Sequence, residues 1–261
     1  MGRFSNRVAL VTGSSSGNGR GIALRLAAEG AAVLCCDLRP DPRPNGFDDE
    51  PEVATHTLIE RHGGRSGFRE CDAGDEESVR RAFGAVVSEL GGLDVAVLNA
   101  GIYHRDVSIL DETSDEHDSI MAVNERGVWL GLRAAGNTFI QAGRGGRIVC
   151  VASSYGLVGA ALAPTYSASK GAVVNLVRAA ALDLAPHQIN VNAVCPGYIA
   201  TAMLHDELAD PHYRAGLEAS TPWPRLGTAD DVAAAVAFLA SDDAAWITGA
   251  ALPVDGGYTC R

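Results

Sequence analysis

Lysine is nearly absent from this chain, although its overall content of charge is ordinary. Of the 21 basic residues only Lys170 is a lysine, and the 32 acidic residues leave a formal net charge of -11. Nucleic-acid backbones and anionic membrane surfaces both reward basic patches, so this balance argues against either of them as a partner. A small-molecule ligand fits the composition better.

Long hydrophobic runs and paired metal-binding cysteines are also missing. No apolar stretch approaches the roughly 18 residues of a membrane span, and the opening segment has too short a hydrophobic run for a signal peptide. We therefore expect a cytoplasmic protein. The six cysteines form no CxxC pair and have no histidine at metal-ligand spacing, which leaves a zinc site without support. Most of them lie in or beside strand-like apolar runs, where we expect buried, reduced thiols.

Short apolar runs alternate with longer segments of helical periodicity along all 261 residues. This alternation is typical of a parallel sheet with helices on both faces, and it predicts a single doubly wound α/β domain over residues 1–261. The seven expected strands are residues 8–11, 32–36, 67–71, 93–98, 147–152, 189–194 and 250–254. The expected helices are 20–29, 76–90, 114–141, 165–184 and 230–239, and Thr113 and Thr228 are expected to cap two of them.

Two segments interrupt this alternation. Residues 39–57 hold four prolines and no periodicity, which predicts a loop inserted after the second strand. This loop could cover a ligand or make a subunit contact. Residues 201–224 mix apolar side chains with two histidines. They form either a helical flap over a site or a surface helix pair, and the flap is favoured because binding segments are often carried on a rigid scaffold.

A glycine-rich turn, TGSSSGNG, joins the first expected strand to the first expected helix over residues 12–19. Glycines let the backbone turn sharply and approach a pyrophosphate, whose charge is stabilised by free amides and by the positive end of the helix. The strand and helix on either side of the turn indicate a dinucleotide-binding Rossmann fold. The expected cofactor contacts here are Gly13, Ser15, Ser16, Gly17, Asn18 and Gly19.

Asp37 ends the second expected strand, where its carboxylate could accept hydrogen bonds from both hydroxyls of an adenosine ribose. A 2′-phosphate would meet like charge at that place, so we expect NAD rather than NADP. Arg39 and Arg43 could in principle offset this repulsion, and Asp37 could also be an ordinary residue of a turn.

Other strand ends should complete the cofactor cleft, because ligands of open α/β sheets bind outside the carboxyl ends of the strands. Asp72 and Ala73 follow the third strand and could hold the adenine edge. Asn99, Ala100 and Gly101 follow the fourth strand, where a glycine lets the backbone pass close to the cofactor.

Tyr166 and Lys170 stand at positions i and i+4 of an expected helix, so they lie one turn apart on the same face. A free tyrosine has a pKa of roughly 10, which is too high for a base at neutral pH, and a nearby cation favours the phenolate. An ammonium is compact and can relay a proton, whereas a guanidinium effectively never loses one. The single lysine thus falls where this chemistry needs an ammonium.

With these motifs the sequence resembles the short-chain dehydrogenase/reductase family over nearly its whole length. The matching segments are TGSSSGNG, LNAG, VNERG, ASS, YSASK, NAVCPGYIAT and LPVDGG. The resemblance implies a catalytic tetrad of Asn124, Ser153, Tyr166 and Lys170, in which Ser153 is preferred to Ser154 for its spacing to the tyrosine. In the family the tyrosine is the acid/base, the lysine holds the nicotinamide ribose and lowers the tyrosine pKa, the serine positions the substrate oxygen, and the asparagine anchors a water.

The resemblance also implies cofactor contacts after the sixth strand. The sequence departs from the family pattern at one position of the glycine-rich turn. Pro196, Gly197, Ile199 and Thr201 match the segment that borders the nicotinamide, and the last two should meet its carboxamide; a plain strand-to-helix turn is the alternative. Asn18 stands where the family usually has an aliphatic residue, and it could bond the cofactor or be tolerated through its backbone. Tyr103, His104 and the flap are expected to shape the substrate pocket.

The leading hypothesis is an NAD-dependent oxidoreductase that interconverts a secondary alcohol and a ketone. An NADPH-dependent 3-oxoacyl-thioester reductase is an alternative, disfavoured because it would need a basic patch for an acidic carrier protein. A non-catalytic NAD sensor is another, disfavoured by the intact tetrad. The family resemblance further implies a homotetramer joined through residues 114–141, 165–184 and the C-terminal strand.

Overall fold

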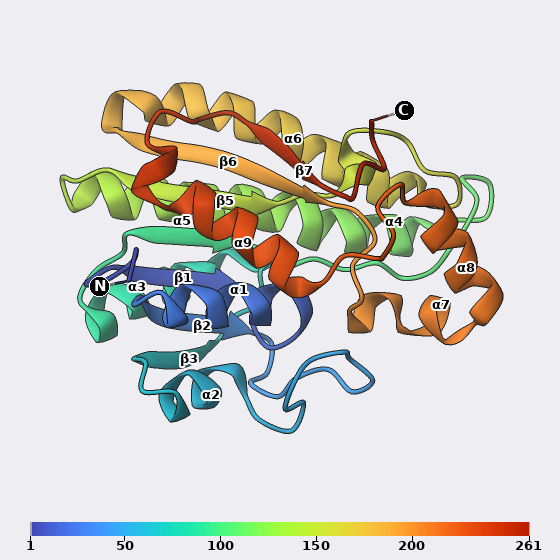
Figure 1. Cartoon of the computed structure of the whole chain (residues 1–261). Coiled ribbons are helices and arrows are strands. Elements are labelled where there is room, and N and C mark those ends of the chain that lie inside the picture. Colours follow the sequence, from blue (N-terminus) through green and yellow to red (C-terminus); the bar gives the residue numbers. More distant parts are fainter. Residues whose placement is uncertain (1, 261) are drawn as a thin grey trace.

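The computed structural model describes residues 2–260, which build a parallel seven-stranded sheet between two layers of helices (Figure 1). The strands are β1 (Val8–Thr12), β2 (Ala32–Asp37), β3 (Ser66–Glu70), β4 (Val95–Leu98), β5 (Gly146–Val151), β6 (Ile189–Pro196) and β7 (Ala251–Val254). Their order across the sheet is β3-β2-β1-β4-β5-β6-β7. The predicted doubly wound fold is confirmed, and each strand bound agrees with the sequence to within a few residues.

The strands are largely apolar because helices cover both faces of the sheet. β1 reads VALVT, and all five of its residues are buried. Burial raises the pKa of the strand thiols Cys35 and Cys150 to about 12. Cys71 is also buried, whereas Cys260 is exposed, so the expectation of core thiols holds for five of the six cysteines.

Helices of different segments share the two faces of the sheet. One face is covered by α1 (Gly17–Ala28), α2 (Thr55–Arg61) and α9 (Ala229–Ala240), and the other by α3 (Glu76–Leu90), α5 (Gly127–Gln141) and α6 (Pro164–Leu184). Both expected caps are present, since Thr113 and Thr228 each accept a hydrogen bond from the backbone amide three residues on and form capping boxes.

Three helix predictions need correction. Helix α1 begins at Gly17, at the phosphate-binding turn itself, rather than at residue 20. Helix α2 takes up the last residues of the predicted 39–57 loop; its seven residues are too few to show a periodic pattern. The expected 114–141 helix is divided into α4 (Ser114–Met121), a π-helical turn (Ala122–Arg126) and α5, which a pattern of apolar spacing does not reveal.

The segment after β6 forms two short helices, α7 (His205–Ala209) and α8 (Pro211–Ser220), beyond the carboxyl ends of the strands at the right of Figure 1. A small satellite core of Leu208, Leu217 and Leu226 holds these helices together. The buried residues of that cluster are separate from the two large clusters on the faces of the sheet.

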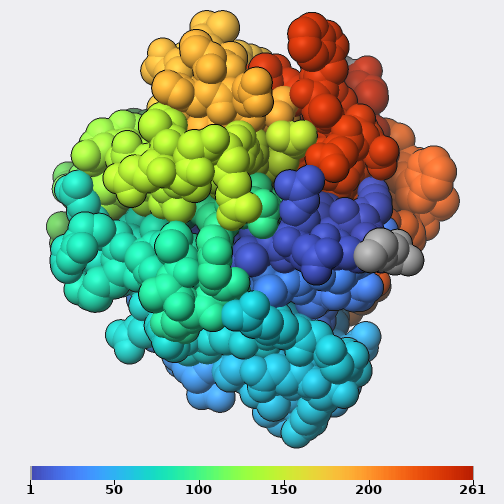
Figure 2. Space-filling view, turned by 90° about the vertical axis from the view of Figure 1, so that its left-hand side faces the viewer, coloured from blue at the N-terminus to red at the C-terminus, as the bar shows by residue number. Residues whose placement is uncertain are grey.

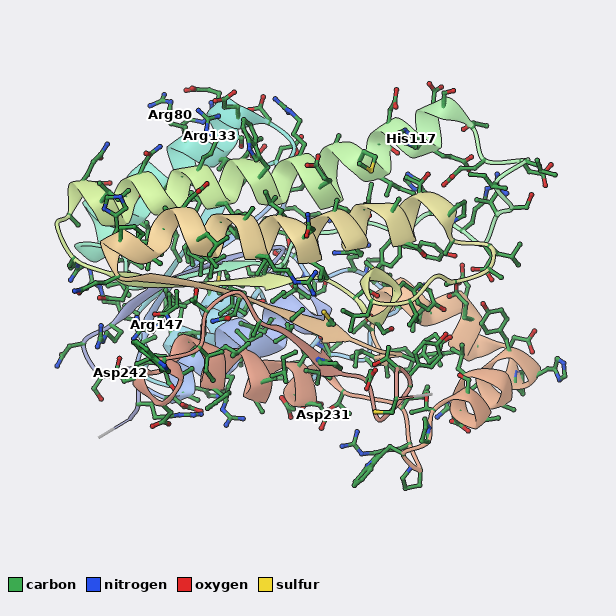
Figure 3. The ribbon with its side chains drawn as sticks, turned by 90° about the horizontal axis from the view of Figure 1, so that it is seen from above. Arg80, His117, Arg133, Arg147, Asp231 and Asp242 are labelled. Atoms are coloured by element: carbon green, nitrogen blue, oxygen red, sulfur yellow. The ribbon has the colours of Figure 1, made fainter. Side chains whose placement is uncertain are left out.

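The opposite end of the molecule, shown in Figure 2, is closed by the N-terminal segment, the connection from α5 to β5 and the residues after α9. Ion pairs cross this end: Asp94 lies 3.6 Å from Arg7 and 3.5 Å from Arg144, and Arg147 lies 3.5 Å from Asp242 (Figure 3). Within residues 2–260, no helix combines the length and apolar character needed to cross a membrane.

Candidate functional site

A cleft lies at the carboxyl ends of the strands, where β1 and β4 are neighbours and the strand order reverses. Ligands of doubly wound folds bind at this topological switch point. The cleft is lined by every residue that the sequence predicts to contact the cofactor, namely Gly13, Ser15, Ser16, Gly17, Asn18, Gly19, Asp37, Asp72, Ala73, Asn99, Ala100, Gly101, Tyr166, Lys170, Pro196, Gly197, Ile199 and Thr201.

The glycine-rich turn is tightly folded against the end of β4. Gly13 has a φ of +64°, and a Cβ at Gly19 would lie 1.9 Å from the carbonyl oxygen of Gly13. The Asn99 side-chain amide donates to the carbonyls of Thr12 and Gly13, both at 3.0 Å. The turn therefore requires glycine at these places, and it presents the N-terminus of α1 to the cleft.

Asp37 is held at the rim of the cleft by main-chain groups. Its carboxylate accepts hydrogen bonds from the amide of Ser15 at 3.0 Å and from the amide of Leu38 at 2.8 Å. Arg39 and Arg43 line the same end of the cleft. The side chains that discriminate an adenosine ribose from its 2′-phosphate would thus meet here, with both signs of charge present.

The inserted segment lies over the glycine-rich turn. The amide of Gly17 donates to both carboxylate oxygens of Asp48, at 3.0 and 3.2 Å. The Phe47 ring lies 6.4 Å from the ring of His205 in α7. A Cβ at Gly46 would lie 3.7 Å from the side chain of Ala202. The segment therefore spans from the dinucleotide end of the cleft to the flap.

A buried arginine anchors this segment. Arg20 is 1% exposed, and its guanidinium donates to the carbonyls of Asp49 at 2.9 Å, Glu50 at 3.0 Å and Val53 at 2.7 Å. These carbonyls satisfy the buried charge without a carboxylate. Neither Asp48 nor Arg20 was identified from the sequence, because each acts on a segment more than twenty-five positions away and neither belongs to a local motif.

Three of the four tetrad residues line the cleft. Lys170 is 3% exposed; its Nζ donates to the carbonyl of Val151 at 3.0 Å and lies 5.7 Å from the centre of the Tyr166 ring. Ser153 caps the turn after β5, where its Oγ accepts a hydrogen bond from the amide of Tyr155 at 3.1 Å. Tyr166 and Lys170 stand one turn apart on α6, as the spacing predicts.

Burial shifts the pKa values of both members of this pair. Burial raises the pKa of Tyr166, and the hydrogen bond with Ser153 offsets only part of that rise. Burial also lowers the pKa of Lys170 to about 8. The Lys170 ammonium is thus desolvated and donates to Val151, while it lies one turn from Tyr166 on the same helix.

Asn124 lies behind the cleft rather than on its wall. It is fully buried at 0% exposure in the π-helical turn. Its Oδ1 accepts from the Ile102 amide at 2.8 Å, and its Nδ2 donates to the Ile102 carbonyl at 2.9 Å and to Ser169 Oγ at 3.3 Å. The side chain thus fixes the loop after β4 to helix α6, which carries the tyrosine.

All six tyrosines of the chain gather at the other end of the cleft. Five of them line it, namely Tyr103, Tyr155, Tyr166, Tyr198 and Tyr213. Tyr258 packs against Tyr155 and Tyr198, with ring centroids 6.3 and 5.2 Å away. The sequence indicated Tyr103, Tyr166 and, as part of the flap, Tyr213, whereas the others come from segments without such a signal.

The flap supplies one wall of this end. Met203, Leu204, Glu207, Tyr213 and Leu217 line the cleft. By contrast, the His104 ring is exposed and lies 2.7 Å from Ser119 Oγ on α4, so the expectation that it shapes the substrate pocket is wrong. The loop after LNAG turns its Tyr103 inward and its His104 outward.

The residues of the dinucleotide end fit a nicotinamide dinucleotide. The glycines leave room for close approach, and the N-terminus of α1 faces the cleft for a diphosphate. Asn18 lines the cleft, and its buried Oδ1 has no hydrogen-bond partner among residues 2–260. Such an acceptor is rare unless something outside the chain satisfies it, and a ribose hydroxyl has the required donor.

Comparison with known proteins agrees with this site. The family model described as enoyl-(acyl carrier protein) reductase matches residues 13–259. The 2-(R)-hydroxypropyl-CoM dehydrogenase of Xanthobacter autotrophicus is 40% identical over 256 residues, 97% of this chain and 99% of the relative. The cyclopentanol dehydrogenase of a Comamonas species is 39% identical over 261 residues, with 100% of both chains covered.

Solved structures are similar over nearly the whole chain. A short-chain type dehydrogenase/reductase from Mycobacterium marinum has a TM-score of 0.90 and 35% identity, and the match covers 99% of this chain and 97% of that one. Carveol dehydrogenase from Mycobacterium avium, in complex with NAD, has a TM-score of 0.91 and 31% identity over 100% of both chains.

Fold, cleft and relatives together define an oxidoreductase that binds a nicotinamide cofactor and acts on CH–OH groups. The chain belongs to the short-chain dehydrogenase/reductase family.

Proposed function

We propose that this protein is an NAD-dependent dehydrogenase that interconverts a secondary alcohol and a ketone, with Tyr166 as the acid/base. The observation that carries this proposal is the convergence of Ser153, Tyr166 and Lys170 on one cleft beside a glycine-rich turn. The names of the two relatives also describe dehydrogenases of alcohols.

The nicotinamide ring supplies or accepts the hydride when the cofactor is bound. Tyr166 takes the alcohol proton during oxidation and returns it to the oxygen during reduction. Ser153 lies beside Tyr166 and positions the substrate oxygen, while Lys170 provides the only buried ammonium at the cleft and stabilises the phenolate. Asn124 keeps the loop after β4 and helix α6 in register, so that these groups meet.

The choice of NAD rests on Asp37 at the rim of the cleft. A ribose 2′-phosphate would bring negative charge against this carboxylate. Arg39 and Arg43 lie near enough to the cleft to temper that repulsion, and one relative, the L-rhamnose 1-dehydrogenase of a Sphingomonas species, carries both NAD and NADP in its name. The NAD assignment therefore requires that repulsion of a 2′-phosphate by Asp37 outweighs its attraction to the two arginines.

The test of the acid/base role is Tyr166→Phe. We expect turnover to fall by about a thousandfold or more, because no other group at the cleft replaces the phenolic proton, while NADH binding measured by fluorescence stays within a few-fold. Tyr258→Phe is the matched control, since it removes a phenol beside the cleft that does not line it, and it should keep most turnover. Retained activity in Tyr166→Phe would show that the acid/base is another group.

The segment 39–57 and residues 201–224 are proposed to cover the bound cofactor and the substrate, respectively. The position of the inserted segment between the glycine-rich turn and His205, and the flap side chains that line the cleft, support these roles. A subunit contact is the alternative role for the inserted segment. The cytoplasmic location stays a prediction.

A homotetramer joined through α5, α6 and the C-terminal strand is proposed as the assembly. The large apolar side chains of Trp129, Ile140 and Leu182 are 40%, 42% and 78% exposed on α5 and α6, which lie side by side (Figure 3). Exposed apolar surface of this kind marks interaction sites. Light scattering coupled to size-exclusion chromatography should give a tetramer, and a monomeric mass contradicts this assembly.

A further inference from the structure

The substrate end of the cleft carries negative charge without a counter-ion. Asp106 and Glu207 both line it, from the loop after β4 and from α7. Among the described residues that line the cleft, the only cations are Arg39, Arg43 and Lys170. The two arginines come from the inserted segment, where the carbonyl of Arg39 accepts a hydrogen bond from Ser15 in the glycine-rich turn, and Lys170 donates to the carbonyl of Val151.

The arginines that are nearest to this end in the sequence are engaged elsewhere. Arg105 precedes Asp106, but its guanidinium donates to Glu116 at 2.8 Å on the outer surface. Arg214 follows Tyr213, and it donates to Glu218 at 2.9 Å along α8. Neither lines the cleft, so neither balances the two carboxylates from within it.

The hydroxyl groups of the tyrosines around the carboxylates are mostly hydrogen-bonded within the protein. Tyr103 and Tyr213 both donate to Asp106, the second at 2.6 Å. Burial, the bond to Asp106 and the charges of Asp106 and Glu207 raise the pKa of both phenols, which places Glu207 within electrostatic reach of this pair. The hydroxyls of Tyr155 and Tyr198 bond each other at 2.9 Å. The groups that can still contact a substrate at this end are therefore mainly the faces of the tyrosine rings and the carboxylates.

Ring faces carry partial negative charge and accept apolar rings and cations, whereas anions are repelled. We propose that this site takes a secondary alcohol or ketone with a compact ring-shaped apolar body that is uncharged or positively charged, and that Glu207 sets this selectivity against anionic substrates. The inference rests on the proposed function, because it assumes that the carbonyl sits at Ser153 and Tyr166. Carboxylates, sulfonates and phosphates near the flap lack any cation to pair with there.

Three ketones of matched shape test the proposal: acetophenone, 4-acetylbenzoate and (4-acetylphenyl)trimethylammonium. The value of kcat/KM for reduction with NADH is measured for each. We expect 4-acetylbenzoate to fall about thirtyfold or more below acetophenone, and the ammonium ketone to equal or exceed it, since like charges at short range raise the free energy of the complex.

Glu207→Arg reverses the charge at the proposed selectivity position and should raise the ratio of 4-acetylbenzoate to acetophenone by about tenfold or more. Asp206→Arg is the matched control, because the same charge change falls on the adjacent, exposed residue that does not line the cleft. It should change the ratio by less than about threefold. Circular dichroism checks that each variant is folded. If Glu207→Arg unfolds, Glu207→Gln replaces it, and the same ratio should rise by about threefold.

Binding is measured separately, by calorimetry on the enzyme loaded with NADH. If 4-acetylbenzoate binds as tightly as acetophenone, if Asp206→Arg shifts the ratio as much as Glu207→Arg, or if none of the three ketones binds, the charge assignment is overturned. If the binding order holds but no ketone is reduced, the proposed dehydrogenase function fails while the charge selectivity of the site stands.

Discussion

The two ends of the cleft differ in the groups that line them, which are mainly main-chain groups at one end and side chains at the other. At the dinucleotide end, the contacts come from glycines, strand ends and backbone amides, all held by the buried sheet and by Asn99. At the substrate end, the walls are side chains of loops and of two short helices, held by a small satellite core and by the bonds of Tyr103 and Tyr213 to Asp106. One end depends on the geometry of the backbone, and the other depends on which side chains meet.

The two ends should therefore tolerate substitutions differently. A backbone cradle tolerates few residues, since a Cβ at Gly19 would clash at 1.9 Å. The flap rests on a satellite core of three buried leucines, so we expect it to tolerate more substitutions than the turn does. Lys170 lies between the two ends, which makes it the place where the comparison can be tested most strongly.

Lys170→Arg should cause the largest effect among the variants that follow. The ammonium is buried and donates to Val151, and a guanidinium is wider and never loses its proton. We expect kcat to fall by about a hundredfold or more, measured with a saturating alcohol and NAD. Arg178→Lys, an exposed position on the same helix, is the control and should stay near the wild-type rate. Near-normal turnover in Lys170→Arg would show that the reaction needs only a positive charge at position 170.

Stability should depend on pH through the same residue. Burial lowers the pKa of Lys170 to about 8 from an ordinary value of 10.5. Between these pH values the unfolded chain binds more protons at this position than the folded chain, so the free energy of unfolding contributed by Lys170 rises with pH. Relative to Lys170→Met, the wild type should gain up to about 3 kcal/mol from pH 8 to 10.5.

The measurement is urea unfolding of both proteins without cofactor at the two pH values. Titrating groups that do not interact with Lys170 cancel in the difference, and Cys150 and Cys195, whose pKa values Lys170 lowers, are replaced by alanine in both proteins. A difference that stays constant across this range would mean that Lys170 is solvated in the folded protein.

Asp37→Ser tests whether a single side chain sets the cofactor preference at the otherwise backbone-built end. Removing the carboxylate should raise the ratio of kcat/KM for NADPH over NADH by about tenfold or more, since Arg39 and Arg43 then face the 2′-phosphate alone. Asp41→Ser, which also lowers the negative charge at this end, should change the ratio far less. Equal shifts in the two variants would mean that overall charge, and not the ribose site, decides.

Asp48→Asn should have the smallest effect of these variants, and it should strengthen the binding of NADH rather than weaken it. The Asp48 carboxylate lies on the amide of Gly17, at the helix N-terminus where a diphosphate is expected. Removing its charge should lower the Kd for NADH by about three- to tenfold. Asp49→Asn changes the neighbouring exposed carboxylate and keeps the carbonyl that Arg20 uses, so it should leave the Kd unchanged. A higher Kd in Asp48→Asn would instead assign Asp48 to cofactor binding.

The sequence predicted the dinucleotide end well because its signals are local. The glycine spacing, Asp37 at a strand end and the i, i+4 pair of Tyr166 and Lys170 each need only a strand, a helix or a turn to place them. The alternation of strands and helices predicts a parallel sheet, and the carboxyl ends of parallel strands lie at one edge.

The substrate end could not be predicted in the same way. Tyr155, Tyr198 and Tyr258 meet only because β5, β6 and the C-terminal segment run side by side, and Tyr213 reaches Asp106 across 107 positions. Asp48 on Gly17 and Arg20 under the inserted segment are equally distant pairs. The π-helical turn that buries Asn124 also has no signature in apolar spacing.

By itself, the sequence determined the Rossmann fold, the phosphate-binding turn and the tyrosine–lysine pair, because each follows from a short-range pattern and the steric demands of the backbone. Only the tertiary structure decided that five tyrosines line one cleft together with Asp106 and Glu207, and that the inserted segment lies over the cofactor turn. Those features depend on long-range packing, in which the position of a side chain is set by segments that no local pattern connects.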